Sequence, residues 1–88
     1  MTYRIEITPA AYRDMKGIPK DAMRRIDAAI LLLAQNPRPP KAKRLQGNLR
    51  DYHRVRIGDY RIIYRIEENR LVVCVVRIGD RKEVYRNQ

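Results

Sequence analysis

Residues 52–65 constrain the fold most, because they predict a β-hairpin with a defined register. Two segments rich in Tyr, Val and Ile flank Gly58 and Asp59, a pair suited to a two-residue primed turn. A loop of this length places Arg56 directly opposite Arg61. Because side chains alternate across a strand, the hairpin acquires two different faces. These residues therefore predict a sheet with one apolar face and one basic face.

The two faces of the hairpin suit different surroundings. The face suited to a core carries Val55, Ile57, Tyr60, Ile62 and Tyr64, and the basic face carries Tyr52, Arg54, Arg56, Arg61, Ile63 and Arg65. Directly opposed like charges destabilise a sheet, and arginine stays charged and binds phosphate through two hydrogen bonds. We interpret the basic face as a phosphate-binding floor. The alternative is a solvated face whose long side chains splay apart.

The length and net charge of the chain limit the classes of protein to which it can belong. Eighty-eight residues predict one small domain, residues 1–88, and the net charge of +10 favours a polyanionic partner, with nucleic acid as the default. The longest apolar run, residues 28–34, is too short to cross a bilayer, and no signal peptide is expected. One histidine and one cysteine, Cys74, cannot form a structural zinc site. We predict a cytoplasmic protein without cofactor or membrane association.

The N-terminal half predicts a strand followed by two helices. Residues 3–7 alternate between apolar and polar side chains, which is typical of a strand. Thr8 and Pro9 are suited to begin a short helix that Gly17 ends. A second helix is expected from Pro19 to about Gln35, with a wide apolar face that Leu31 and Leu32 extend.

The C-terminal half predicts strands. Residues 38–47 are basic and rich in proline and are expected to form neither helix nor strand. Residues 71–76 are apolar throughout, as in a strand in the middle of a sheet, and residues 82–85 predict a last short strand. The result is an α+β domain in the order β-α-α-β-β-β-β: a small antiparallel or mixed sheet of four to five strands with both helices on one face.

Further basic residues lie near the predicted hairpin. Those that could extend an RNA-binding surface are Lys41, Lys43, Arg44, Arg65 and Arg77. For the loop that carries the first three, a solvated crossover explains the composition equally well. The single histidine, His53, falls on the core face of the hairpin, which favours a packed or capping residue over a catalyst.

Three segments carry a resemblance to a known family: Leu45-Gln46-Gly47, residues 53–64 and residues 76–85. Together they resemble the RelE/ParE superfamily of bacterial and archaeal toxins along nearly the whole chain. The resemblance implies a RelE-like microbial ribonuclease-type fold and two functional branches. RelE-like toxins cleave messenger RNA in the ribosomal A site, whereas ParE-like toxins poison DNA gyrase and lack the basic catalytic set.

The catalytic positions of the RelE-like branch hold compatible residues in this chain, namely Arg54, Arg56, Arg61, Arg81 and Tyr85. The resemblance implies that Arg54 and Arg61 stabilise the phosphate, that Arg81 protonates the leaving oxygen, and that Tyr85 stacks on a base or orients the 2′-hydroxyl. Arg56 stands where the resemblance suggests a lysine acting as the base, so the identity of the base stays open. The implied partners are a cognate antitoxin, the ribosome with its mRNA, and operator DNA for the toxin–antitoxin complex.

Two alternatives to a ribonuclease toxin stay open. One is a ParE-like gyrase inhibitor without nuclease activity, and the other is a basic nucleic-acid-binding domain of the same fold without catalysis.

Overall fold

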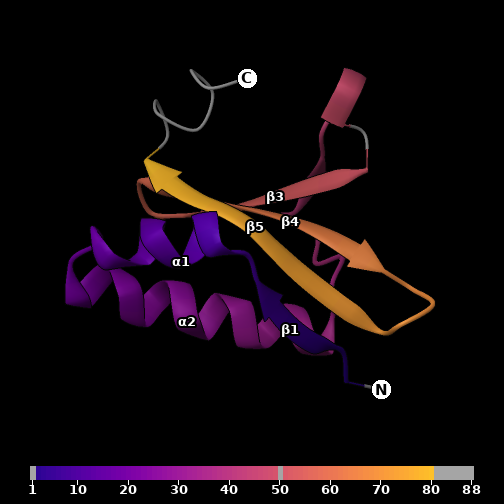
Figure 1. Cartoon of the computed structure of the whole chain (residues 1–88), viewed down its shortest axis with the longest axis horizontal. Coiled ribbons are helices and arrows are strands. Elements are labelled where there is room, and N and C mark those ends of the chain that lie inside the picture. The colour runs from indigo at the N-terminus through magenta and orange to yellow at the C-terminus, as the bar shows by residue number, and fades with distance from the viewer. Residues whose placement is uncertain (1, 50, 81–88) are drawn as a thin grey trace.

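The computed structural model describes residues 2–49 and 51–80 and forms one mixed sheet in the strand order β1-β5-β4-β3-β2 (Figure 1). The elements are β1 (Arg4–Ile7), α1 (Pro9–Lys16), α2 (Lys20–Gln35), β2 (Lys43–Arg44), a 3-10 turn (Gly47–Leu49), β3 (Tyr52–Ile57), β4 (Tyr60–Glu67) and β5 (Val72–Asp80). β1 runs parallel to β5, and the other pairs are antiparallel. The predicted α+β class and element order are confirmed.

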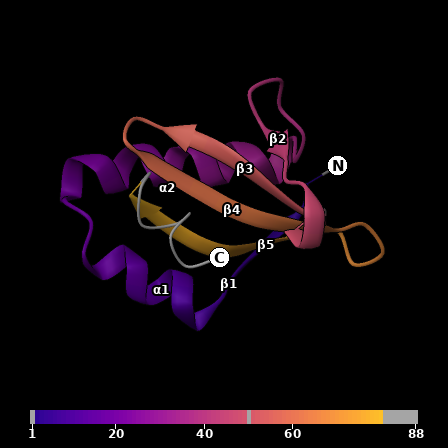
Figure 2. The same cartoon turned by 90° about the horizontal axis from the view of Figure 1, so that it is seen from above.

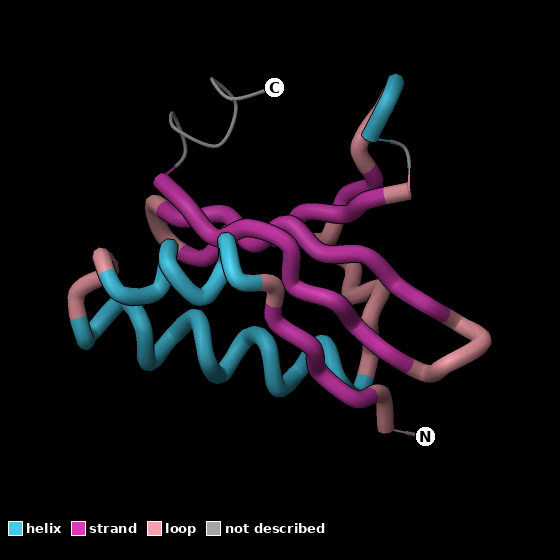
Figure 3. Tube along the Cα trace, in the orientation of Figure 1, coloured by secondary structure: helices cyan, strands magenta, loops and turns pink. Residues whose placement is uncertain are grey.

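Both helices lie on the same face of the sheet, as predicted (Figures 1 and 3). Thr8 caps α1, because its Oγ1 accepts a hydrogen bond from the Ala11 N–H at 3.1 Å, and Gly17 ends the helix. Helix α2 begins one residue after Pro19. In the parts of the chain that the structure describes, neither helix is long and apolar enough to cross a membrane.

The core lies between the helices and the apolar face of the hairpin. Its buried members are Ala11, Ile26, Ile30, Leu33, Val55, Ile62, Tyr64, Val73, Val75 and Ile78. The Tyr64 hydroxyl donates a hydrogen bond to the Pro37 carbonyl at 2.7 Å, which ties the sheet to the chain after α2. Leu31 and Leu32 are 66% and 65% exposed, so the expectation that they widen the packed face of α2 was wrong. Successive residues of a helix are about 100° apart around its axis, so Leu31 and Leu32 point away from the face that their buried neighbours Ile30 and Leu33 occupy.

The predicted register of the hairpin is confirmed. Arg56 pairs with Arg61, and Val55 pairs with Ile62. The turn places Gly58 at φ +60°, a conformation that glycine adopts without steric cost. Figure 2 shows β4 between β3 and β5.

Strand β2 contradicts the expectation that residues 38–47 contain no strand. Lys43 pairs with Arg54, and the Leu45 N–H donates to the Tyr52 carbonyl at 2.9 Å. A two-residue strand is too short to show an alternating pattern, so sequence periodicity could not reveal it.

Strand β5 is longer than predicted, because it continues past residue 76 to Asp80. An irregularity in β4 between Ile63 and Tyr64 shifts the register between β4 and β5, and the two strands pair on both sides of it. The expected last strand, residues 82–85, lies outside the described residues.

Helix α1 protects the far part of β5, where β1 has already ended. Thr8 donates from its N–H to the Val75 carbonyl and from its hydroxyl to the Val76 carbonyl. Asp14 then accepts a hydrogen bond from the Ile78 N–H at 3.0 Å and from Arg77 Nε at 2.8 Å. Thr8, which precedes α1, and the side chain of Asp14 in α1 therefore satisfy backbone groups that a neighbouring strand would otherwise pair.

Candidate functional site

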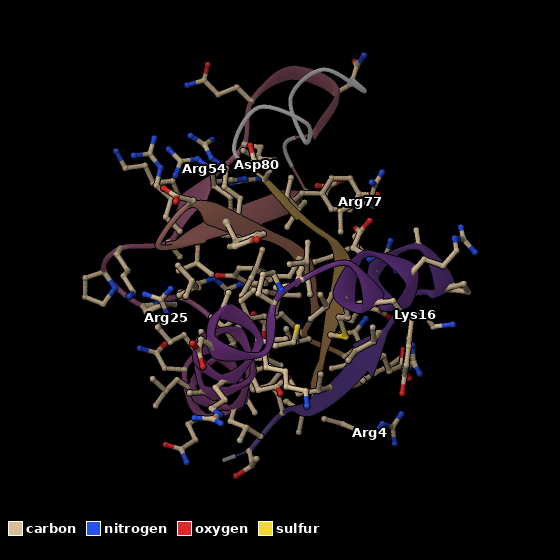
Figure 4. The ribbon with its side chains drawn as sticks, turned by 90° about the vertical axis from the view of Figure 1, so that its left-hand side faces the viewer. Arg4, Lys16, Arg25, Arg54, Arg77 and Asp80 are labelled. Carbon is tan, nitrogen blue, oxygen red and sulfur yellow. The ribbon has the colours of Figure 1, made fainter. Side chains whose placement is uncertain are left out.

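Two rows of basic side chains cross the sheet on the face away from the helices. In the first row Lys43 of β2 lies opposite Arg54 of β3, and in the second Arg56 of β3 lies opposite Arg61 of β4. Figure 4 shows Arg54 on the side of the sheet away from the helices. Directly opposed cations repel each other, so this arrangement favours an anionic ligand.

Three cations in these rows have no ion-pair partner among the described residues. Lys43, Arg54 and Arg56 form no ion pair with any carboxylate in residues 2–49 or 51–80. Lys43 and Arg56 are exposed, and Arg54 is half-buried. We name Lys43, Arg54 and Arg56 the basic cluster. Its surface can accept several phosphate oxygens without first breaking an internal ion pair.

Arg61 lies deeper than expected. The sequence predicted an open arginine face, but Arg61 is only 4% exposed, and Ile63 beside it on the same face is equally buried. β4 is the central strand, so side chains from β3 and β5 flank these residues on both sides. Arg61 therefore lies beneath the surface that the basic cluster forms.

At the other end of the same face, arginines are neutralised. Arg70 contacts Glu6 at 2.9 Å and Glu67 at 3.0 Å, and Arg65 contacts Glu67 at 3.2 Å. Hydrogen bonds from Arg70 and then Arg65 lower the pKa of the Glu67 carboxyl, and the bond to Glu67 raises the pKa of Arg65. The predicted RNA-binding residue Arg65 thus belongs to an ion-pair network.

Arg77 also has a carboxylate partner. It lies in the same row as Arg54, but its side chain binds Asp14 of α1 through Nε at 2.8 Å and Nη2 at 3.3 Å. The hydrogen bond to Asp14 raises the pKa of the Arg77 guanidinium. The structure therefore separates Arg65 and Arg77 from the basic cluster.

The other candidate residues occupy different places. Lys41 is exposed in the loop before β2. Arg44 lies opposite His53 and, with Arg38, Asp51, Arg65 and Ile66, lines a pocket of about 370 Å³. Arg38 was not predicted, because nothing in its spacing links it to the hairpin. Arg81 and Tyr85 lie outside the described residues, so their roles stay predictions.

His53 is packed as the sequence indicated. Its ring stacks on Tyr64 with centroids 5.5 Å apart, and its Nδ1 is buried. Burial, followed by the charges of Arg38 and Arg44, lowers the pKa of His53. This environment favours a neutral imidazole that packs against Tyr64.

One group of side chains has the spacing of a metal site. Ligand atoms of Glu6, Glu67 and Cys74 lie within 4.8 Å of one another. Both carboxylates already bind Arg70, so a metal ion would have to displace that guanidinium. These contacts favour a structural ion-pair network at this position.

Comparisons with known proteins agree with this architecture. The family model for the ParE toxin of the parDE type II toxin–antitoxin system matches residues 5–85. The chain is 33% identical over 85 residues to the RelE toxin of Mycobacterium tuberculosis, covering 96% of this chain and 87% of that protein. It is 29% identical over 90 residues to the putative toxin RelE1 of Methanocaldococcus jannaschii, covering 99% of each.

Solved structures resemble the chain over a similar extent. The RelBE2 toxin–antitoxin complex of M. tuberculosis contains a chain that superposes with a TM-score of 0.84 at 26% identity, covering 92% of this chain and 93% of that one. The RelE–RelB complex of Pyrococcus horikoshii gives 0.80 at 29% identity, covering 93% and 98%. The chain therefore belongs to the ParE toxin family of type II toxin–antitoxin systems, and it is a RelE-like toxin.

Proposed function

We propose that this toxin is a ribosome-dependent endoribonuclease that inhibits translation by cleaving mRNA in the ribosomal A site. The observation that carries the proposal is the basic cluster: two directly opposed cation pairs on one sheet face, with Lys43, Arg54 and Arg56 free of carboxylate partners among the described residues. Phosphate groups of an RNA strand supply the missing negative charge.

The proposed reaction uses the 2′-hydroxyl of the RNA as nucleophile on the adjacent phosphate. The products are a 2′,3′-cyclic phosphate and a 5′-hydroxyl. Negative charge grows on the phosphate oxygens in the transition state, and fixed donors near these oxygens lower the barrier. The side chains of Arg54 and Arg56 stabilise this negative charge from the surface of the sheet. The buried Arg61 supports it from below, because its side chain is held within the sheet face.

The remaining assignments come from the RelE-like resemblance. Arg81 protonates the leaving 5′-oxygen, and Tyr85 stacks on a base or orients the 2′-hydroxyl. The ribosome contributes by holding the mRNA in a reactive geometry. The enzyme acts in the cytoplasm, where its ribosomes are.

We further propose a cognate antitoxin as partner. The solved relatives include RelBE2 and RelE–RelB toxin–antitoxin complexes. With a net charge of +10, the toxin attracts an acidic, partly disordered segment that wraps around it. The complex would bind operator DNA of its own operon.

A second candidate is inhibition of DNA gyrase, because the matching family model describes the ParE toxin. The RNA proposal is favoured because two opposed cation pairs on one face suit a ligand with closely spaced phosphates. The two candidates differ in target, so separate assays distinguish them.

Primer extension on mRNA in a purified translation system tests the proposal, with and without ribosomes. The wild type should cut within A-site codons only when ribosomes are present. Arg54→Gln and Arg56→Gln should each lower the cleavage rate by about 100- to 1,000-fold, as expected for loss of one transition-state donor. Arg81→Ala tests the assignment taken from the resemblance.

The matched control is Arg24→Gln, because Arg24 is an exposed arginine on α2, on the opposite side of the sheet. It should cleave as the wild type does. Absence of cuts by the wild type, together with inhibition of gyrase supercoiling, would replace the ribonuclease by the gyrase candidate. Absence of both activities with retained RNA binding would leave a non-catalytic binding domain.

A further inference from the structure

Cleavage by the 2′-hydroxyl requires a group that accepts its proton. The three cations that the hairpin places in the two basic rows are all arginines, Arg54, Arg56 and Arg61. Arginine remains protonated in proteins, so it stabilises charge but cannot take a proton. The hairpin alone therefore lacks a proton acceptor on the face that would bind RNA.

Strand β2 adds a different kind of cation to this face. Lys43 pairs directly with Arg54 across the antiparallel β2–β3 ladder. Side chains opposed in this way have Cβ atoms about 4.5–5.5 Å apart, and the diagonal neighbour Arg56 is about 7–8 Å away. The four-carbon stem of Lys43 spans these separations, so its Nζ can reach a phosphodiester held by either arginine.

Lys43 is also available for chemistry. Its side chain is exposed, and it has no ion pair with any carboxylate of the described chain. An ion-paired lysine would have to lose its partner before it could exchange a proton with substrate. A lysine without such a partner needs only to give up its own proton to solvent before it accepts one from substrate.

Other proton acceptors face elsewhere. His53 pairs with Arg44 and Tyr64 in a row on the helix side of the sheet. Asp80 pairs with Tyr60, whose side chain packs toward the core. Asp14 is occupied by Arg77 and by the Ile78 N–H. None of the described residues in the two basic rows is acidic.

We propose that Lys43 is the general base of the cleavage reaction, an inference that rests on the proposed ribonuclease function. In its amine form, Lys43 Nζ takes the proton from the 2′-hydroxyl while the O2′–P bond forms. The P–O5′ bond breaks, and the leaving oxygen takes a proton from the proposed general acid. Solvent water then carries the proton from the Lys43 ammonium back to that acid, which restores both groups and balances the reaction.

Single-turnover cleavage of mRNA on ribosomes, at saturating toxin, tests this role with Lys43→Arg and Lys43→Gln. Lys43→Arg keeps the charge and removes the transferable proton site, whereas Lys43→Gln removes both. Both variants should lose about 100- to 10,000-fold in rate, the range of general base catalysis. The wild-type rate should rise with pH, as general base catalysis requires, and this dependence should be lost in Lys43→Arg.

Lys20→Arg is the matched control, because Lys20 is exposed at the start of α2 on the helix side of the sheet. It should keep the wild-type rate and pH profile. Thermal unfolding of every variant confirms that the fold is intact, as expected for an exposed position. A Lys43→Arg enzyme with the wild-type rate and pH profile would overturn the inference, because Lys43 would then act by charge alone. This outcome leaves the ribonuclease proposal standing, whereas a wild type that cuts no RNA refutes that proposal itself.

Discussion

Replacing Asp14 by alanine should destabilise the fold more than replacing Arg77, its ion-pair partner. Asp14 Oδ2 accepts a hydrogen bond from the N–H of Ile78, a residue only 1% exposed. A hydrogen bond to a charged group contributes about 1.5–3 kcal/mol, and its loss leaves a buried N–H without that partner. This bond therefore dominates the effect of the substitution.

The ion pair itself contributes less. Side chains of Arg77 and Asp14 are 40% and 19% exposed, so solvent screening reduces the pair to about 0.5–1 kcal/mol. Asp14 also lies in the last turn of α1, where a carboxylate opposes the helix dipole by about 0.3–0.5 kcal/mol. We expect Asp14→Ala to cost about 2–3 kcal/mol and Arg77→Ala about 0.5–1 kcal/mol.

Urea unfolding and thermal unfolding, each followed by circular dichroism, measure both variants and the double variant. The loss in Asp14→Ala should lower the melting temperature by about 10–20 °C, from about 4–8 °C per kcal/mol for a domain of this size. The coupling energy of the double-mutant cycle should equal the ion pair alone, about 0.5–1 kcal/mol. An Asp14→Ala variant no less stable than Arg77→Ala would refute the role of the backbone bond. If Arg77→Ala reduces cleavage and keeps the wild-type stability, Arg77 contacts RNA as the sequence predicted.

Two further substitutions probe Tyr64 and His53, whose rings stack on each other. Tyr64→Phe should cost about 1–2 kcal/mol in urea unfolding, because it leaves the buried Pro37 carbonyl without its 2.7 Å hydrogen bond; an unchanged midpoint would show that the bond contributes nothing. Burial lowers the pKa of His53 below its ordinary value of about 6.5, so the unfolded chain binds this proton at higher pH than the folded protein does. The contribution of His53 is thus fully present above about pH 6.5 and is lost as pH falls through the lowered value. His53→Phe should reduce the loss of stability between about pH 8 and pH 5.5, and an equal loss in both proteins would contradict this reasoning.

Local patterns in the chain predicted much of the fold. The Gly58-Asp59 turn determines which residues of β3 and β4 oppose each other, and the structure confirms that register. Thr8, Pro9 and Gly17 mark both ends of α1. The paired arginines of the candidate site followed from the same register, because a two-residue turn leaves no freedom to shift the strands.

Other features of the site depend on contacts between distant segments. Nothing in the spacing of Lys43 shows that two residues of a basic loop join the sheet beside Arg54. The neutralisation of Arg77 by Asp14 was equally hidden, because this contact depends on the docking of α1.

The sequence by itself thus determined which residues share a face of the hairpin, since alternation and turn length act between near neighbours. Only the tertiary structure decided which of those cations keep an unbalanced charge. That charge depends on carboxylates contributed by other elements: Asp14 of α1 neutralises Arg77, whereas Arg54 and Arg56 have no ion pair in the described part of the chain. Periodicity reports the direction of a side chain, whereas its electrostatic environment is set by whatever the folded chain brings beside it.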